Sequence, residues 1–498
     1  MSAEVAGTDW RGLDRRSLAA SAVLSFTIVA PAVLVLVRIA SANDWGVTPT
    51  VLACAGAGVL IVLGTLVYDL LRLRTTSWRL TGERLELRSG VAVRQHRSIP
   101  RERVRSVDLK ADPVRRALGL AVVKVGTGEQ AGGEHAELTL DPLTRQEAED
   151  LRHALLLRAP ATGAAGAAEH ERPALAVLDW SWLRYAPLTV WSFIGAALVL
   201  GAAYKPLDAL GLDEGLAESA WKWVTGDPWR AVPLILAVNV LAGAAGAAAV
   251  FATSWGRYRL EREPGRLRLS RGLLTTRSMT LEERRLRGVE LAEPLLLRLG
   301  GGARVKVVTT GLRKREEKEA DDVSVLTPPM PLAGALELAG QVSGSALPAR
   351  LHGRPKAALH RRLRLGVVET VVLAGVAGLL DLWWLPAWIW LLPLVNLPIA
   401  LLYARAEYRA LGHALGERHL VSRQGVAARR TVALERRGII GWRIKESYFQ
   451  RRLGLITLTA TTAAGPGHYD VPDLDGSAGL DLAARTVPGL LDEFLTKQ

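Results

Sequence analysis

Cysteine is almost absent from this sequence. Cys54 is the only one in 498 residues, so a single chain can form neither a disulfide framework nor a cysteine-based zinc or iron–sulfur site. The nine histidines are scattered, and none has a second metal ligand at a useful spacing. We therefore expect no metal and no cofactor.

Catalytic motifs are lacking as well. The sequence contains no P-loop, no G-x-S-x-G elbow and no H-E-x-x-H pair. The run of glycines at 300–302 lacks the lysine and the serine or threonine of a phosphate cradle, which favours a turn between two strands. We expect no catalytic residues and no enzyme activity.

Long apolar stretches are what the sequence does contain. Hydrophobic residues make up 49% of the chain, and six stretches form three pairs: 17–39 with 47–71, 183–203 with 229–254, and 365–380 with 385–403. About 20 apolar residues span a bilayer as a helix, so the pattern predicts six transmembrane helices in three hairpins. The stretch 365–380 is short and contains Glu369, which leaves an interfacial or re-entrant segment open.

The distribution of charge predicts the orientation. The formal charge is +14, yet the connections inside the three hairpins are neutral or acidic while the flanking segments are basic. The positive-inside rule then places both termini and all large polar segments on the cytoplasmic side of the cell membrane.

Residues 350–364 are basic with no acidic residue, directly before a predicted span. Such a segment is attracted to anionic lipid headgroups, and nucleic acid is not expected as a partner because the tryptophans cluster near span ends instead. The predicted headgroup contacts are Arg350, Arg354, Lys356, Arg361, Arg362 and Arg364.

Two polar residues lie within predicted spans, Glu369 and Asn239. Glu369 lies near the cytoplasmic edge, where we expect it to pair with the basic residues 361–364; a transport or relay role is the alternative. For Asn239 we expect a hydrogen bond between helices.

Each hairpin is followed by a polar segment, and the three segments resemble one another. They begin at Trp78, Tyr258 and Glu407, and turn glycines follow at Gly90, Gly272 and Gly425. A second set of glycines, each after a leucine, falls at Gly119, Gly300 and Gly454, at nearly constant spacing. This agreement indicates internal duplication.

Each copy has the pattern of β-strands followed by a helix. Alternating apolar residues flank the turn glycines, and β-branched runs follow the second set of glycines. The predicted closing helices are 143–157, 332–342 and 488–495. The fold class is therefore α+β, attached to membrane helices.

The motifs Trp78-Arg79-Leu80, the Gly90 turn, Ile99-Pro100-Arg101 and Leu118-Gly119-Leu120 resemble the bacterial pleckstrin-homology-like (PH-like) domains that flank membranes. Three copies, each behind a hairpin, are similar to the YdbT-type proteins of that family. The resemblance implies a PH-like split β-barrel with a C-terminal helix in each copy. The third copy lacks the opening motif and the proline, so we expect it to be degenerate.

The expected organisation alternates membrane hairpins with PH-like domains. A tail (1–16) precedes hairpin 17–71, domain 75–158, linker 159–182, hairpin 183–254, domain 255–342, basic linker 343–364, hairpin 365–403 and domain 404–498. We predict a non-catalytic scaffold or interaction protein, in a role such as envelope-stress response, that contacts the membrane, protein partners or itself. A component of a transporter or export system is the alternative.

Overall fold

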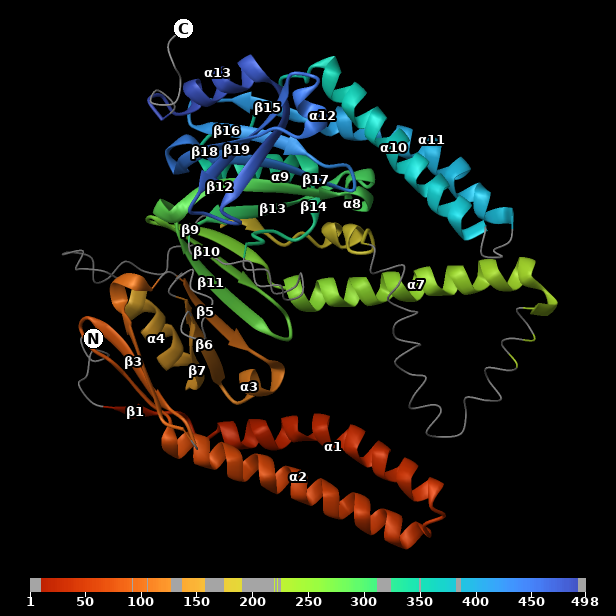
Figure 1. Ribbon diagram of the computed structural model, residues 1–498. Coiled ribbons are helices and arrows are strands. Elements are labelled where there is room, and N and C mark those ends of the chain that lie inside the picture. The colour runs from red at the N-terminus through yellow and green to blue at the C-terminus, as the bar shows by residue number, and fades with distance from the viewer. Residues whose placement is uncertain are drawn as a thin grey trace. The chain divides into compact units, whose positions relative to one another are not determined.

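A computed structural model describes residues 10–91, 93–104, 106–126, 137–156, 174–189, 219, 222, 225–310, 324–348, 351–381 and 387–490 (Figure 1). The chain divides into two compact units, Met1–Glu283 and Arg284–Gln498.

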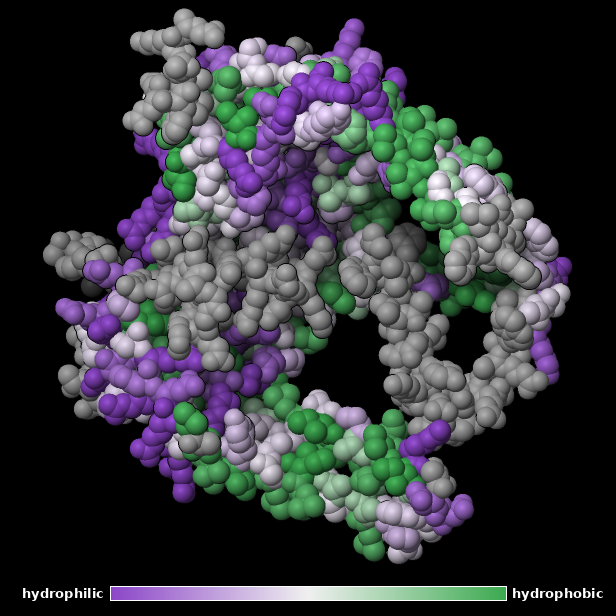
Figure 2. Space-filling view, viewed as in Figure 1, coloured by the Kyte–Doolittle hydropathy of each residue, from purple (hydrophilic) through white to green (hydrophobic). Residues whose placement is uncertain are grey.

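Long helices come from the apolar stretches. α1 (Ser17–Ala42) and α2 (Val47–Thr75) form a hairpin in the first unit, which also contains α7 (Pro228–Trp255). In the second unit α10 (Lys356–Asp381) pairs with α11 (Leu391–Ala410), after the 3-10 turn η6 (Ala387–Trp390). Figure 2 shows hydrophobic residues covering α1 and α2, as expected for helices that face lipid.

Four described helices are long and apolar enough to cross a membrane: Ser17–Ala40, Val47–Thr75, Pro228–Trp255 and Lys356–Leu380. The predicted span 183–203 is described only to residue 189, so most of it lies outside the described residues. α11 is not among the four, because two prolines, Asn396 and the charged Arg405 and Glu407 lower its mean hydropathy.

Two antiparallel sheets lie in the first unit. One has the order β1-β2-β3-β4, and the other has the order β7-β6-β5-β11-β10-β9-β8. The first copy supplies β2 (Ser77–Leu80), β3 (Arg84–Ser89), β4 (Gln95–Pro100), β5 (Ser106–Ala111), β6 (Leu120–Gly126) and β7 (Glu137–Thr144). The second copy begins in the same unit with β9 (Arg259–Glu263), β10 (Arg266–Arg271) and β11 (Thr276–Glu282).

The second unit contains sheets of order β14-β13-β12-β17-β16-β15 and β18-β19-β20. The second copy continues here with β12 (Leu286–Pro294), β13 (Gly302–Thr309) and β14 (Met330–Pro331). The third copy supplies β15 (Gly412–Leu415), β16 (His419–Gln424), β17 (Ala428–Glu435), β18 (Ile439–Lys445), β19 (Leu455–Thr462) and β20 (His468–Asp475). The third copy thus has the same order of strands as the first, so its degeneracy concerns sequence and not strand order.

Short helices recur at the same places in each copy. A 3-10 turn follows β4, β11 and β17, namely η1 (Arg101–Arg103), η4 (Glu283–Arg285) and η7 (Arg436–Gly438). A single helical turn precedes the last pair of β-strands in each copy: α3 (Pro113–Ala117), α8 (Leu295–Leu299) and α12 (Tyr448–Arg451). The closing helices are α4 (Arg145–Leu156), α9 (Leu332–Ser343) and α13 (Gly476–Thr486).

Segments predicted as tail and linker also form strands. β1 (Arg11–Gly12) joins the edge of β2, and Leu13 enters the core of the first copy. Within the predicted linker, β8 (Ala174–Val177) pairs with β9 and is followed by the 3-10 turn η3 (Trp180–Tyr185).

The cores follow the alternation of apolar residues. In the first copy, buried residues of β2–β4, β5–β7 and α4 form one cluster that includes Trp78, Leu85, Val123 and Leu151. In the third copy, Leu420, Leu458 and Leu482 belong to the corresponding cluster. Burial of these side chains is the main term that stabilises each copy.

The strand register corrects three sequence alignments. Val107 pairs with Val125, Val289 with Val307 and Trp442 with Ala460, so these pairs are counterparts in the three copies. Counting from them, the counterpart of Gly119 is Gly301, with φ of 74°, and not Gly300.

The opening motif is displaced in the same way. Trp78 pairs with Leu87, and Leu260 pairs with Leu269, so Leu260 and not Tyr258 is the counterpart of Trp78. In the third copy, residues 407–409 lie in α11, and the counterpart of Trp78 is His413 on β15.

The closing helix of the third copy also differs from prediction. It is α13, ahead of the predicted 488–495, whose last five residues lie outside the described residues. On this helix Gly479 faces the core of the third copy, and a Cβ there would lie 2.5 Å from Cδ1 of Ile456. The buried face of α13 consists of Gly479, Leu482, Ala483 and Thr486, so only one large apolar side chain marked it in the sequence.

Candidate functional site

Successive copies share β-sheets. β5 of the first copy pairs with β11 of the second, and β12 of the second pairs with β17 of the third. We call these two pairings the joints. Both have the same register, because Val107 lies opposite Thr280 and its counterpart Val289 lies opposite Ala433, the counterpart of Thr280.

Each joint contains an ion pair at the same position. In the first joint Asp108 accepts from Nη2 of Arg277 at 2.7 Å and from Nε at 2.8 Å. In the second joint their counterparts Glu290 and Arg430 lie 3.8 Å apart. The repeated charge pair supports the register, because opposite charges diagonal across a strand pair attract.

The second joint has one more ion pair. The guanidinium of Arg429 donates from Nε to Oε2 of Glu293 at 2.8 Å and from Nη2 to Oε1. Glu293 is almost fully buried. A bidentate pair of this kind fixes geometry as well as charge.

The base of α10 is held to the third copy by a buried carboxylate. Arg361 Nη2 lies 2.8 Å from Oδ1 of Asp473, and Arg362 donates to Oδ2 from Nη2 at 2.8 Å and from Nε at 3.1 Å. Asp473 is fully buried at the end of β20. We call Arg361, Arg362, Asp473 and Gln450 the anchor.

The geometry of the anchor keeps Asp473 ionised. Burial alone would raise the pKa of Asp473, but the hydrogen bonds and positive charges of Arg361 and Arg362 lower it below its ordinary value. Gln450 of α12 adds a bond from Nε2 to Oδ1 at 3.0 Å. Asp473 has φ of 57°, a left-handed conformation that aspartate and asparagine tolerate better than most residues.

The anchor extends onto α11 and along the helix pair. Arg362 also contacts Glu407 of α11 in a close ion pair. Further along, Asn396 of α11 donates to Oγ1 of Thr370 on α10 at 3.0 Å. This hydrogen bond between apolar helices was not predicted, although an asparagine within an apolar stretch is its usual signal.

A further basic residue, Arg354, is buried beside β15. Its Nη1 lies 3.1 Å from Nδ1 of His413, and its backbone carbonyl accepts from the hydroxyl of Tyr408 at 3.0 Å. Burial lowers the pKa of Arg354 to about 10. Burial, followed by the charge of Arg354, lowers the pKa of His413 to about 4. His413 is therefore neutral at pH 7.

The predicted headgroup contacts divide into two groups. Arg354, Arg361 and Arg362 turn inward and are largely buried, whereas Lys356 and Arg364 are exposed. Arg350 lies outside the described residues. The basic segment is therefore partly a structural element, which its sequence could not indicate because Asp473 is more than one hundred residues away.

The residues of the opening motif are structural. Trp78 and Leu80 are buried in the first core, and Arg79 donates to Glu86 at 2.7 Å, which lowers the pKa of Glu86. Gly90 and Gly119 have φ of 124° and 70° at turns. Pro100 ends β4, and Arg101 bonds the carbonyl oxygens of Gly82 and Ala154.

The two polar residues of the predicted spans, Glu369 and Asn239, remain apart from these clusters. Glu369 is exposed on α10, and the expected ion pair with Arg361–Arg364 is not formed, because Arg361 and Arg362 bind Asp473 instead. Asn239 is half-buried on α7, and its Oδ1 has no partner within the described part of the chain.

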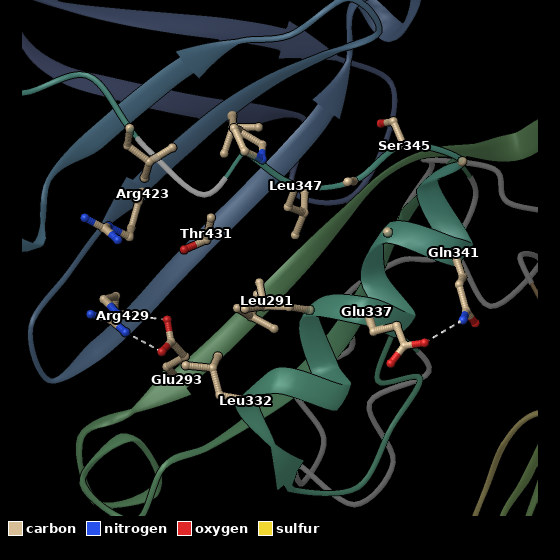
Figure 3. Close-up of a pocket in the computed structure, with 17 residues that line it drawn as sticks. Leu291, Glu293, Leu332, Glu337, Gln341, Ser345, Leu347, Arg423, Arg429 and Thr431 are labelled. Atoms are coloured by element: carbon tan, nitrogen blue, oxygen red, sulfur yellow. Dashed lines mark hydrogen bonds and ion pairs between the residues drawn. The ribbon is translucent and has the colours of Figure 1, made fainter.

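A pocket of about 710 Å³ opens beside the second joint (Figure 3). Leucines of β12, α9 and the following segment line it, with Arg423 and the Arg429–Glu293 pair on the strand side. Burial, together with the like charge of Arg429, lowers the pKa of Arg423. An apolar wall with a few polar groups at one side is typical of small-molecule sites. No cluster of metal-ligating residues occurs among the residues that the structure describes.

Comparison with known proteins gives one family. The family model described as bacterial PH domain matches residues 20–159, 212–343 and 363–488. No curated protein and no solved structure matches the chain.

Proposed function

Because the chain belongs to the bacterial PH domain family, we propose that it is a non-catalytic integral membrane protein whose three PH-like domains form an interaction scaffold. Each of the three matched regions includes at least one apolar helix and the β-strands that follow it in the sequence. In this proposal six helices cross the cell membrane, and each PH-like domain is a split β-barrel closed by its C-terminal helix.

The observation that carries the scaffold proposal is the pair of joints. Asp108–Arg277 and Glu290–Arg430 repeat the same contact in the same register, so each domain holds the next by backbone pairing and charge. A chain of domains linked by flexible linkers alone would not need such pairing. Shared sheets suit a protein whose domains meet their partners as linked modules.

Membrane attachment is supported by four apolar helices and by the anchor. The four helices expose large hydrophobic side chains to their surroundings. The anchor connects α10 to the third domain through buried charges. Basic residues flank the hairpins, which supports cytoplasmic termini and cytoplasmic PH-like domains. Envelope-stress response is one setting in which such a scaffold would act.

The scaffold is tested with the full chain, because the isolated first domain would lack the strand that pairs with β5. The tagged protein is purified from native membranes beside Asp108→Arg and, as a matched charge reversal, Asp481→Arg on exposed α13. We expect a reproducible set of protein partners with the wild type and Asp481→Arg, and loss of that set with Asp108→Arg at equal membrane level. The same set captured by a membrane protein unrelated in sequence, or an unchanged set with Asp108→Arg, would contradict the proposal.

The topology is tested separately with reporter fusions at both termini. Cytoplasmic signals from both ends are expected. An extracytoplasmic C-terminus would contradict the proposed orientation.

A further inference from the structure

The short helix α12 and the residue that follows it, Arg452, present two aromatic and two basic side chains outward. Tyr448 is 59% exposed and Phe449 is 38% exposed, and the two rings meet edge to face with centroids 5.5 Å apart. Arg451 has a side chain that is 74% exposed, and Arg452 is exposed with its guanidinium 4.7 Å from the centre of the Tyr448 ring. We call these four residues the α12 face.

The helix is rigidly placed by the residue between them. Gln450 is buried, and its Nε2 donates to Asp473 at 3.0 Å and to Thr457 at 2.8 Å. A capping box with Ser447 fixes the first turn. Since Asp473 binds Arg361 and Arg362, α12 is connected through one carboxylate to the base of α10.

This connection determines the depth of the α12 face relative to the membrane. The apolar part of α10 starts at Leu365. Arg362 lies three residues before it, which corresponds to about 4.5 Å along the helix axis. The polar headgroup region adds roughly 5–7 Å on each side of the hydrocarbon core. If α10 spans the membrane, the anchor lies in the headgroup region, and α12 lies beside it.

The chemistry of the α12 face matches that layer. Aromatic rings are enriched at membrane interfaces, and arginines next to a membrane are attracted to anionic headgroups. The neighbouring strand β18 continues the pattern with exposed Ile440, Arg443 and Ile444. An acidic residue beside the helix, Glu446, is half-exposed and 4.0 Å from Arg451, too distant and too solvated to neutralise it.

The counterpart helices differ in this respect. On α3, Arg115 is paired with Asp112 and Asp141, and Arg116 donates to the carbonyl of Leu273. The other counterpart, α8, is mainly leucine, with Leu299 75% exposed. Among the three counterparts, α12 is the one with two exposed arginines.

We propose that the α12 face binds the anionic headgroups of the membrane that α10 crosses, an inference that rests on the proposed membrane function. The α12 face then makes the headgroup contacts that the sequence predicted for Arg354, Arg361 and Arg362. The side chains of these three arginines are instead largely buried in the protein. The third PH-like domain is then held to the membrane at two adjacent points, α10 within the bilayer and the α12 face on its surface.

The test measures the depth of single labels in the full chain, reconstituted in nanodiscs. In a Cys54→Ser background, a fluorophore is placed at Tyr448→Cys, at Val371→Cys on the exposed side of α10, and at Asp481→Cys on α13. Spin-labelled lipids quench at the headgroup or in the acyl chain. The discs contain phosphatidylcholine alone or with phosphatidylglycerol.

We expect headgroup quenching at 448 that increases with phosphatidylglycerol and decreases at high salt, with no quenching at 481. Arg451→Gln with Arg452→Gln should shift the docked population by about fivefold for each charge removed, and Arg451→Lys with Arg452→Lys should restore it. Equal quenching at 448 and 481, or no dependence on phosphatidylglycerol and the arginines, would overturn the inference. Absence of acyl-chain quenching at 371 would instead overturn the proposed membrane function.

Discussion

Asp108 of the first copy and Arg277 of the second are joined across two strands, with 2.7 Å between Oδ2 and Nη2. Both side chains are mostly buried, at 12% and 16% exposure. Their counterparts Glu290 and Arg430 repeat the pair in the second joint. Each copy of the repeat therefore carries, at the same positions, the residues that bind it to the next copy.

Exchange of the two charges tests this pair. Asp108→Arg and Arg277→Asp, each alone, leave like charges across the joint, and we expect faster amide hydrogen exchange in β5 and β11. The double variant should recover ~1–3 kcal/mol of local stability. The exposed Asp481 and Arg485, exchanged in the same way, serve as the control and should show almost no effect.

Removal of the charge at the anchor should loosen the third copy from α10. Asp473→Asn keeps a residue that tolerates φ of 57° but leaves Arg361 and Arg362 without their carboxylate, at a cost of about 3–5 kcal/mol. Asp473→Ala should cost ~1 kcal/mol more, because alanine is strained in this conformation. Hydrogen exchange in β20 and α12 measures both; equal protection in wild type and Asp473→Asn would contradict the role of the anchor.

Acid should destabilise the third copy through His413. Its pKa of about 4 lies below the ~6.5 of an unfolded histidine, so the unfolded chain binds the proton first. Stability conferred by neutral His413 is complete above about pH 6.5 and is lost as the pH falls toward 4, by roughly 1–3 kcal/mol.

His413→Leu introduces the residue type found at the counterpart Leu260 and should remove this part of the pH dependence. Burial also lowers the pKa of His419, so that residue retains a contribution of the same sign. Urea unfolding at pH 7 and pH 5 compares the two proteins. An unchanged difference between the two pH values would show that His413 is not responsible.

Gly272 should tolerate no side chain. Its φ is 104°, and a Cβ would lie 1.9 Å from the carbonyl oxygen of Thr275. Gly265, in the preceding turn, has φ of 71° and open space around it. We expect Gly265→Ala to cost ~1 kcal/mol and Gly272→Ala to cost clearly more, measured by hydrogen exchange in β10 and β11. Similar losses would mean that the backbone at Gly272 can relax.

Local features of the fold were predictable from the sequence. The apolar runs marked α1, α2, α7 and the apolar part of α10, and the glycines marked the turns at Gly90, Gly272 and Gly425. Trp78 and Leu260 pair with Leu87 and Leu269 at the same sequence separation, so the similar letters at Tyr258-Arg259-Leu260 led to an alignment of Tyr258 with Trp78 that was wrong by two residues.

The candidate site depended on contacts that are distant in sequence. Nothing near Arg361 and Arg362 indicates that their carboxylate is Asp473, and basic residues before an apolar stretch are ordinarily read as lipid contacts. The joints were equally hidden. Strand pairing between copies depends on which edges remain open after each copy folds, and a periodic pattern does not contain that information.

The third copy has an arginine, Arg443, on β18 where the first two copies have Asp108 and Glu290. In the register of the joints, β4 of another molecule would place Arg97 directly opposite Arg443, and like charges at opposed positions repel. Head-to-tail contacts of one kind propagate into open filaments unless something stops them. The change of sign at Arg443 thus replaces the attraction that both joints share with a repulsion at the last open strand edge, which disfavours the addition of a further copy.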